Sequence, residues 1–199
     1  MKSYIKEIVL AVGVFLFLSQ KALSLSPVAN CEAEDYQYSI GTDVSPWMME
    51  GYSFLYSSLS GNCRLTLETW EIVFPQGFID LNKHNKAEDW RRKATGVSLY
   101  LDTFYTAQDE KWYSGLIFST FRSSLSRIDH TKEKSYRSYE ILLRFGYKYH
   151  ITKQLSIDPW FALGPIVTDG KEPKIFGETF QESKFQVLAT MHVSYKLSY

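Results

Sequence analysis

The chain ends in Phe185-Gln-Val-Leu-Ala-Thr-Met-His-Val-Ser-Tyr-Lys-Leu-Ser-Tyr199, where apolar residues recur at every second position. Successive side chains of a strand point to opposite faces, so this stretch predicts a strand with one apolar and one polar face. The apolar row consists of Phe185, Val187, Ala189, Met191, Val193, Tyr195, Leu197 and Tyr199. In an outer membrane, lipid covers such a face, and about ten residues suffice to cross. We therefore predict the closing strand of a membrane β-barrel.

The N-terminus has the layout of a secretory signal peptide. Lys2 and Lys6 precede the apolar run Ile8–Leu18, and the small-residue stretch Ala22–Ser24 follows. This is the charged, apolar and cleavage-site order of an export signal, and the run is too short to span a bilayer as a helix. We predict a signal peptide over residues 1–24, cleaved after Ser24, and a barrel over residues 25–199; an uncleaved anchor is the alternative.

The composition suits a barrel of alternating faces. Aromatic residues make up 16% of the chain, yet the mean hydropathy is only −0.22. Lipid-facing and lumen-facing residues that alternate along each strand would give this combination. The net charge of zero argues against a nucleic-acid partner.

Eight segments have strand-like patterns, separated alternately by short turns and long polar connections. We expect strands at Tyr36–Thr42, Ser53–Leu59, Asn62–Phe74, Val97–Tyr105, Trp112–Arg122, Tyr136–Tyr149, Leu155–Val167 and Phe185–Tyr199. An even strand number with long loops on one side is typical of bacterial outer-membrane barrels. The pattern predicts an all-β fold, a single eight-stranded antiparallel up-and-down transmembrane β-barrel with both termini periplasmic. Pro159 and Pro165 predict a bulge in the seventh strand.

Two stretches resemble a known family. The run from Tyr139 to Ile157, Tyr-Glu-Ile-Leu-Leu-Arg-Phe-Gly-Tyr-Lys-Tyr-His-Ile-Thr-Lys-Gln-Leu-Ser-Ile, and the terminal Val193-Ser-Tyr-Lys-Leu-Ser-Tyr199 are similar to the small outer-membrane β-barrel proteins of bacteria. The resemblance implies the fold and the outer-membrane location but no activity. Family members more often end in Phe than in Tyr. We expect a C-terminal assembly signal composed of Val193, Tyr195, Leu197 and Tyr199.

Polar residues on the lumen side of the expected strands predict an interior network. Its members are Arg64, Glu68, Asp102, Glu140, Arg144, Lys148, Asp158, His192 and Lys196. Eight strands enclose a space about wide enough for side chains to fill, so we expect no wide pore. Charges of both signs in such a space pair with one another and with trapped water. With a turn centred at Ile151 or Thr152, Arg144 would lie opposite Asp158 or Trp160 and within reach of Asp158.

Three loops contain residues that could act at the outer surface. Asp129-His130-Thr131 lies with Ser123–Ser126 in the expected loop Ser123–Ser135, where an acid, a base and a nucleophile would be available. The loop Asn82–Lys93 is rich in basic residues, and Lys174–Phe180 places apolar residues in a polar loop. The basic loop could contact lipid phosphates or sugar acids, or simply be solvated. The apolar segment could contact a partner or fold back on the rim.

These features leave three functions open. The first is a structural, surface-binding or adhesion-type role in the outer membrane. The second is an enzyme that modifies envelope lipid, an acyl hydrolase or transferase. The third is a soluble exported barrel that binds a small apolar ligand. We expect a monomer whose partners are membrane lipid, lipopolysaccharide and the barrel assembly machinery. No cofactor is expected and no metal, since His84, His150 and His192 lie on separate elements.

Cys31 and Cys63 are expected to form a disulfide near the periplasmic rim, because an exported chain leaves the reducing cytosol. The alternative, lipid modification of Cys31, fits less well because Asn30 stands where a small residue is usual. A disulfide that closes a loop of about thirty residues stabilises a protein by roughly 3–4 kcal/mol in the chain-entropy model. Thiol titration of the folded, unreduced protein should detect no free thiol; two reactive thiols would contradict the disulfide.

Overall fold

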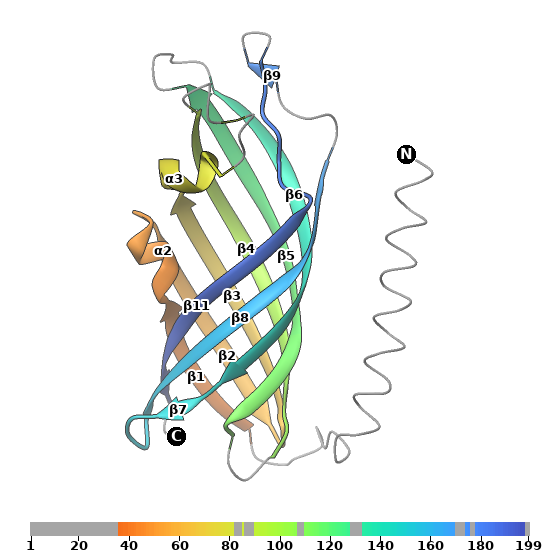
Figure 1. The fold of residues 1–199 in the computed structure, drawn as a ribbon. Coiled ribbons are helices and arrows are strands. Elements are labelled where there is room, and N and C mark those ends of the chain that lie inside the picture. Colours follow the sequence, from red (N-terminus) through yellow and green to blue (C-terminus); the bar gives the residue numbers. More distant parts are fainter. Residues whose placement is uncertain are drawn as a thin grey trace, which may run out of the picture.

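The computed structural model describes residues 36–81, 85, 90–106, 110–127, 133–169, 174–175 and 178–197. Most of this part of the chain forms strands that curve into a ring (Figure 1). The long strands are β1 Tyr36–Asp43, β2 Tyr52–Ser60, β3 Cys63–Val73, β4 Trp90–Phe104, β5 Trp112–Arg127, β6 Lys134–Tyr147, β8 Leu155–Thr168 and β11 Phe185–Lys196. The short elements are α2 Val44–Met48, α3 Gln76–Ile79, β7 Tyr149–His150, β9 Lys174–Ile175 and β10 Glu178–Thr179.

The long strands form a closed antiparallel barrel. Each pairs with its neighbours along the chain, and β11 pairs with both β8 and β1 to close the ring. β7 continues β6 along the edge of β8, so the described residues give eight full strands. The predicted eight-stranded antiparallel up-and-down barrel is confirmed, and each predicted strand has its counterpart.

The two ends of the barrel differ (Figure 1). The lower end holds the tight turns and the last described residues, whereas α2, α3 and the β9–β10 hairpin lie at the upper end. The turn between β2 and β3 is a two-residue loop in which Gly61 has a φ of 58°, a conformation that favours glycine.

The predicted signal peptide, Cys31 and Tyr199 lie outside the described residues. No helix in the described part of the chain is long and apolar enough to cross a membrane.

Two strands extend further upward than the sequence predicted. β4 begins at Trp90 and β5 ends at Arg127, and these two residues pair with each other. The placement of Arg91–Lys93 and Ser123–Ser126 in loops was therefore wrong. The wall continues above the apolar belt, where outward side chains are polar, so the alternation that marks a lipid-facing strand disappears while the strand itself does not.

The expected bulge at the two prolines is also absent from β8. The register with β11 runs unbroken from Phe185 opposite Pro165 to Tyr195 opposite Leu155. Pairing with β6 stops around Pro165 and ends before Pro159, but its register is unchanged on both sides of the interruption. A proline lacks the N–H that the ladder needs, and here the consequence is lost pairing without an inserted residue.

The hairpin formed by β6 and β8 has the expected faces but a different register. Arg144 lies opposite Ala162 and Gly146 lies opposite Trp160, which centres the turn on Lys153. The expected position of Arg144 opposite Asp158 or Trp160 was therefore wrong, because the turn lies one to two residues further along. Arg144 still points inward and is buried, and Leu143 still points outward.

An apolar belt surrounds the outside of the wall. Exposed large apolar side chains occur on every long strand: Tyr36, Ile40, Tyr52, Phe54, Tyr56, Leu65, Leu67, Val97, Leu101, Trp112, Phe118, Tyr139, Ile141, Phe161, Val167, Phe185, Val187 and Tyr195. A soluble protein rarely exposes so continuous an apolar surface. The belt is the surface that lipid would cover.

Leu143→Arg places a cation on the outward face of β6 and should impair insertion into lipid vesicles. An arginine at the middle of the lipid face costs roughly 2–4 kcal/mol. The measurement is the folded fraction after dilution from denaturant into vesicles, with Leu143→Phe as the matched control. Insertion of Leu143→Arg as efficient as that of the control would contradict the assignment of this face.

Candidate functional site

The lower half of the barrel interior is filled by two arginines that share one carboxylate. Asp102 on β4 accepts through Oδ2 from Arg64 Nη2 at 2.9 Å and from Arg144 Nη1 at 2.9 Å. Arg64 Nη1 also donates to Asp158 Oδ2 at 2.6 Å, which ties β3 to β8 across the lumen. All four side chains are buried. We call Arg64, Asp102, Arg144 and Asp158 the ionic layer.

Aromatic rings enclose the two guanidinium groups. The Arg64 guanidinium carbon lies 4.5 Å from the centre of the Tyr113 ring, and that of Arg144 lies 4.6 Å from the Trp160 ring. Tyr100 faces Arg144 from another side at 4.7 Å. Ring faces attract cations most strongly where water is excluded, so these contacts add to the ion pairs. Together the charges and rings occupy the lumen at this level.

His192 connects the ionic layer to the end of β1. Arg144 Nη2 lies 3.1 Å from His192 Nδ1, and His192 Nε2 lies 3.2 Å from Asp43 Oδ2. An arginine can only donate, so Nδ1 accepts and the ring proton is on Nε2, the nitrogen nearer Asp43. Asp43 Oδ1 in turn accepts from the backbone N–H of Ser45 at 2.7 Å and from the Ser45 hydroxyl at 2.9 Å.

Asp43, Glu68 and His192 are close enough to suggest a metal site, since one ligand atom from each lies within 4.8 Å of the others. The hydrogen bond from Arg144 to Nδ1 opposes this use. A metal on Nε2 would displace the ring proton while Nδ1 still accepts from a cation, which requires an imidazolate. A metal-binding histidine normally donates its second ring N–H instead. The geometry therefore fits an ion-paired histidine better than a metal ligand.

The structure separates the residues that the sequence assigned to the interior network. Arg64, Glu68, Asp102, Glu140, Arg144, Asp158 and His192 are buried. Glu68 accepts from the Tyr100 hydroxyl, and Lys148 Nζ is paired with Glu110 at 2.8 Å near the lower end. The placement of Lys196 in the network was wrong. Its side chain has the same parity as that of His192, but it is exposed because the strand ends at the lower rim.

A second polar cluster near the upper end was missed. Arg92 Nη1 lies 2.9 Å from Glu182 Oε1, the Arg92 guanidinium donates to Ser123 Oγ, and the Tyr136 hydroxyl donates to Glu182. The Arg92 guanidinium carbon also lies 4.2 Å from the centre of the Phe74 ring. The sequence predicts Arg92 within the basic loop Asn82–Lys93 instead. The alternation of Arg92, Ala94 and Gly96 with polar residues could have indicated a strand.

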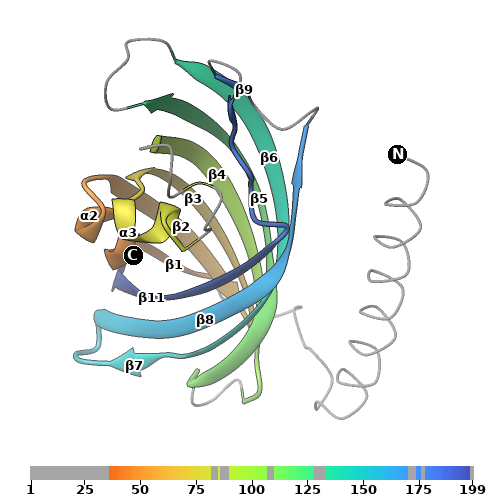
Figure 2. The same cartoon turned by 45° about the horizontal axis from the view of Figure 1, so that its top comes forward.

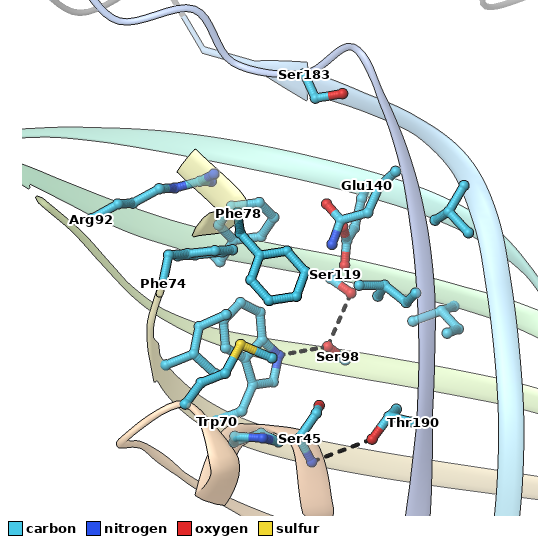
Figure 3. A pocket seen from close by; sticks show the side chains of 18 of the residues that line it. Ser45, Trp70, Phe74, Phe78, Arg92, Ser98, Ser119, Glu140, Ser183 and Thr190 are labelled. Atoms are coloured by element: carbon cyan, nitrogen blue, oxygen red, sulfur yellow. Dashed lines mark hydrogen bonds between the residues drawn. The ribbon is translucent and has the colours of Figure 1, made fainter. Parts of the chain in front are cut away.

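A cavity of about 690 Å³ lies between the ionic layer and this upper cluster. Asp43, Glu68, Tyr100 and Trp160 line it on the side of the ionic layer, and Arg92, Phe180 and Glu182 line it near the upper end. Its wall is mainly apolar and is formed by Trp70, Ile72, Phe74, Phe78, Ile117, Phe121 and Leu188. Figure 3 shows a row of hydrogen-bonded polar groups across this wall. Trp70 Nε1 donates to Ser98 Oγ at 2.8 Å, and the Ser98 and Ser119 hydroxyls are hydrogen-bonded to each other. This volume is typical of pockets for small ligands.

The loop residues considered for catalysis do not converge in the described part of the chain. Asp129, His130 and Thr131 lie outside the described residues. Ser123 is buried in β5 and accepts hydrogen bonds from Arg92, which is not a base. His192 has an arginine on one ring nitrogen and a carboxylate on the other, so neither nitrogen faces a hydroxyl nucleophile.

The structure describes parts of the two other loops, the basic loop Asn82–Lys93 and the apolar segment Lys174–Phe180. In the expected basic loop, Arg91 and Lys93 are exposed on β4, and residues 82–84 and 86–89 lie outside the described residues. In the apolar loop, Phe180 is buried and packs edge-on against Trp90 at 5.6 Å between ring centres. This segment was expected either to contact a partner or to fold back on the rim, and Phe180 folds back on the barrel.

Comparison with solved structures finds bacterial outer-membrane proteins at low identity. A major outer membrane protein from Thermus thermophilus is 12% identical with a TM-score of 0.45, and the match covers 82% of this chain and 100% of that one. Neisserial surface protein A is 10% identical with a TM-score of 0.45, covering 82% and 95%. Ail, the attachment invasion locus protein of Yersinia pestis, is 10% identical with a TM-score of 0.42, covering 81% and 97%. No protein-family model and no curated protein matches the chain.

Asp102→Ala should destabilise the barrel strongly, because it leaves two buried guanidinium groups without their shared carboxylate. Breaking a buried ion pair from one side costs about 3–5 kcal/mol. Glu71→Ala, which breaks the more exposed pair with Lys93, is the control, and an exposed pair contributes only about 0–1 kcal/mol. The measurement is the free energy of unfolding in detergent micelles. Equal losses in the two variants would contradict a structural role for the ionic layer.

Proposed function

We propose that this protein is an outer-membrane barrel that does not conduct solutes and acts as a binding protein through its upper cavity. The observation that carries the proposal is the ionic layer. Arg64 and Arg144 converge on Asp102 from two strands, and aromatic rings fill the space around them. A solute moving through the lumen would have to separate these pairs, which is costly where water is excluded.

The apolar belt supports the membrane location. It continues around all eight strands, whereas a soluble exported barrel would expose polar side chains on its outside. The expected signal peptide and C-terminal assembly signal fit the same location. With both termini periplasmic, the upper end with α2, α3 and the β9–β10 hairpin would face outward.

The cavity supports binding at that outward end. It is lined by aromatic and aliphatic side chains, and its one arginine is neutralised by Glu182. We propose membrane lipid or lipopolysaccharide as the partner met there. The lipid-modifying enzyme remains the second candidate, but His192 faces Arg144 and Asp43 rather than a hydroxyl, so it is not placed to act as a base.

Reconstitution in planar lipid bilayers tests the proposal. The mature protein should give no sustained ion conductance, because the ionic layer blocks the lumen. Arg144→Gly removes a guanidinium group from that layer and should raise conductance, whereas Arg92→Gly, the same change above the cavity, should not. Open channels in the unmodified protein, or its recovery in the periplasmic fraction without detergent, would contradict the proposal.

A further inference from the structure

The barrel wall has a gap at its upper end, between β11 and β2. β1 ends at Asp43, opposite His192 of β11. Above this level, residues 185–191 of β11 pair with β8 alone among the described strands, and residues 52–54 of β2 pair with β3 alone. Figure 2 shows α2 and α3 on the side of β11 that faces away from β8, and Ser45 of α2 donates to Thr190 of β11. We call the space between β11 and these two helices the window.

The cavity reaches the window. Six consecutive residues of β11, from Phe185 to Thr190, line it. Consecutive side chains of a strand point to opposite faces, so a cavity confined to the lumen would contact every second residue only. Contact with all six means that the cavity extends to the free edge of the strand. Met49 beside α2 and Phe78 and Leu81 around α3 line it as well.

The rim of the window is apolar. Val187 on β11 is 69% exposed, Met48 on α2 is 80% exposed and Leu81 after α3 is 79% exposed. Phe185 and Phe78, which line the cavity, are exposed as well. A water-filled opening would be expected to have polar side chains around it. The apolar side chains of this rim instead join the apolar belt outside to the apolar wall inside.

The geometry points to one acyl chain of a membrane lipid as the occupant, passing sideways through the window into the cavity. This inference rests on the proposed membrane location and names the ligand of the proposed binding site. The lipid supplies two complementary parts. Its hydrocarbon chain matches the apolar wall, and its headgroup can hydrogen-bond the backbone groups of the free β11 edge, which bare hydrocarbon would leave unsatisfied.

A second barrel pairing through the β11 edge fits less well. α2 covers the lower part of that edge, where the Ser45 N–H donates to Thr190 Oγ1 at 3.3 Å and the Thr190 hydroxyl donates to Asp43. Only residues 185–189 of the edge remain for a strand of another chain to pair with. A lipid needs only the opening and the cavity behind it.

Photochemical labelling tests the inference. The mature protein is reconstituted in phosphatidylethanolamine and phosphatidylglycerol vesicles that contain a phospholipid with a diazirine at the end of one acyl chain. After irradiation, adducts are mapped by mass spectrometry. We expect adducts on inward residues of the cavity wall such as Phe121, in addition to adducts on outward residues such as Phe161.

Matched variants identify the route. Leu188→Trp and Gln186→Trp fill the cavity from β11 and should lose the inward adducts while keeping the outward ones. Tyr195→Trp places the same ring on the outward face of the same strand, below the window and outside the cavity lining, and should keep both. Protease resistance of each variant in vesicles shows that it is folded. If one of the two filling variants does not fold, the other still tests the inference.

Three results would overturn the inference. Adducts confined to the outward belt would mean that no chain occupies the cavity. Inward labelling by a diazirine fatty acid added from water, without inward labelling by the phospholipid, would mean that the ligand does not arrive from the bilayer. Cross-links between two copies at the β11 edge would assign the window to a dimer. If any of these occurs while the protein stays in the membrane and does not conduct, the proposed location and the closed lumen stand, and this inference fails.

Discussion

A buried cation must be neutralised close by, and this barrel places two of them beside a single carboxylate. Asp102 receives Arg64 and Arg144 from different strands, and Asp158 and His192 complete the partners of the two arginines. In a low-dielectric interior the penalty for an unpaired charge is large, so the strands that carry these residues are held in one register. The closed lower lumen follows from this arrangement, and the cavity exists only where the ionic layer ends.

The faces of the strands could be predicted from sequence because alternation is a local property. Burial of one side chain in two, as in Leu143 and Arg144, is determined by backbone geometry alone. The register between strands could not be predicted in the same way. The expected partner of Arg144, Asp158, depended on where the β6–β8 turn is centred, and the turn lies one to two residues further along. The observed partner, Asp102, lies level with Arg144 because both are opposite Gly115 of β5. Pairings across the lumen, such as Arg64 with Asp158, depend on barrel closure and have no local signal.

The strands at the upper end could not be predicted from the sequence, for a related reason. Outward residues above the belt no longer need to be apolar, so β4 and β5 continue through stretches that look like polar loops. Arg92 and Ser123 became interior residues as a result. The gap beside β11 was not foreseen either, because it arises from the early end of β1 at Asp43 and the helix that follows. The end of β1 is supported by hydrogen bonds to Asp43 from Ser45, two residues away, and from Thr190, 147 residues away in the sequence.

The most direct test of the closed lumen is the hydrogen exchange of the Arg64 Nε–H, which donates to Asp102 Oδ2 at 3.1 Å. Nuclear magnetic resonance in detergent micelles can follow this proton separately from the backbone amides. A guanidinium sealed within the ionic layer should exchange much more slowly than an exposed arginine such as Arg91. Exchange of Arg64 as fast as that of Arg91 would mean that water reaches the layer freely, and would contradict the closed barrel on which the proposed function depends.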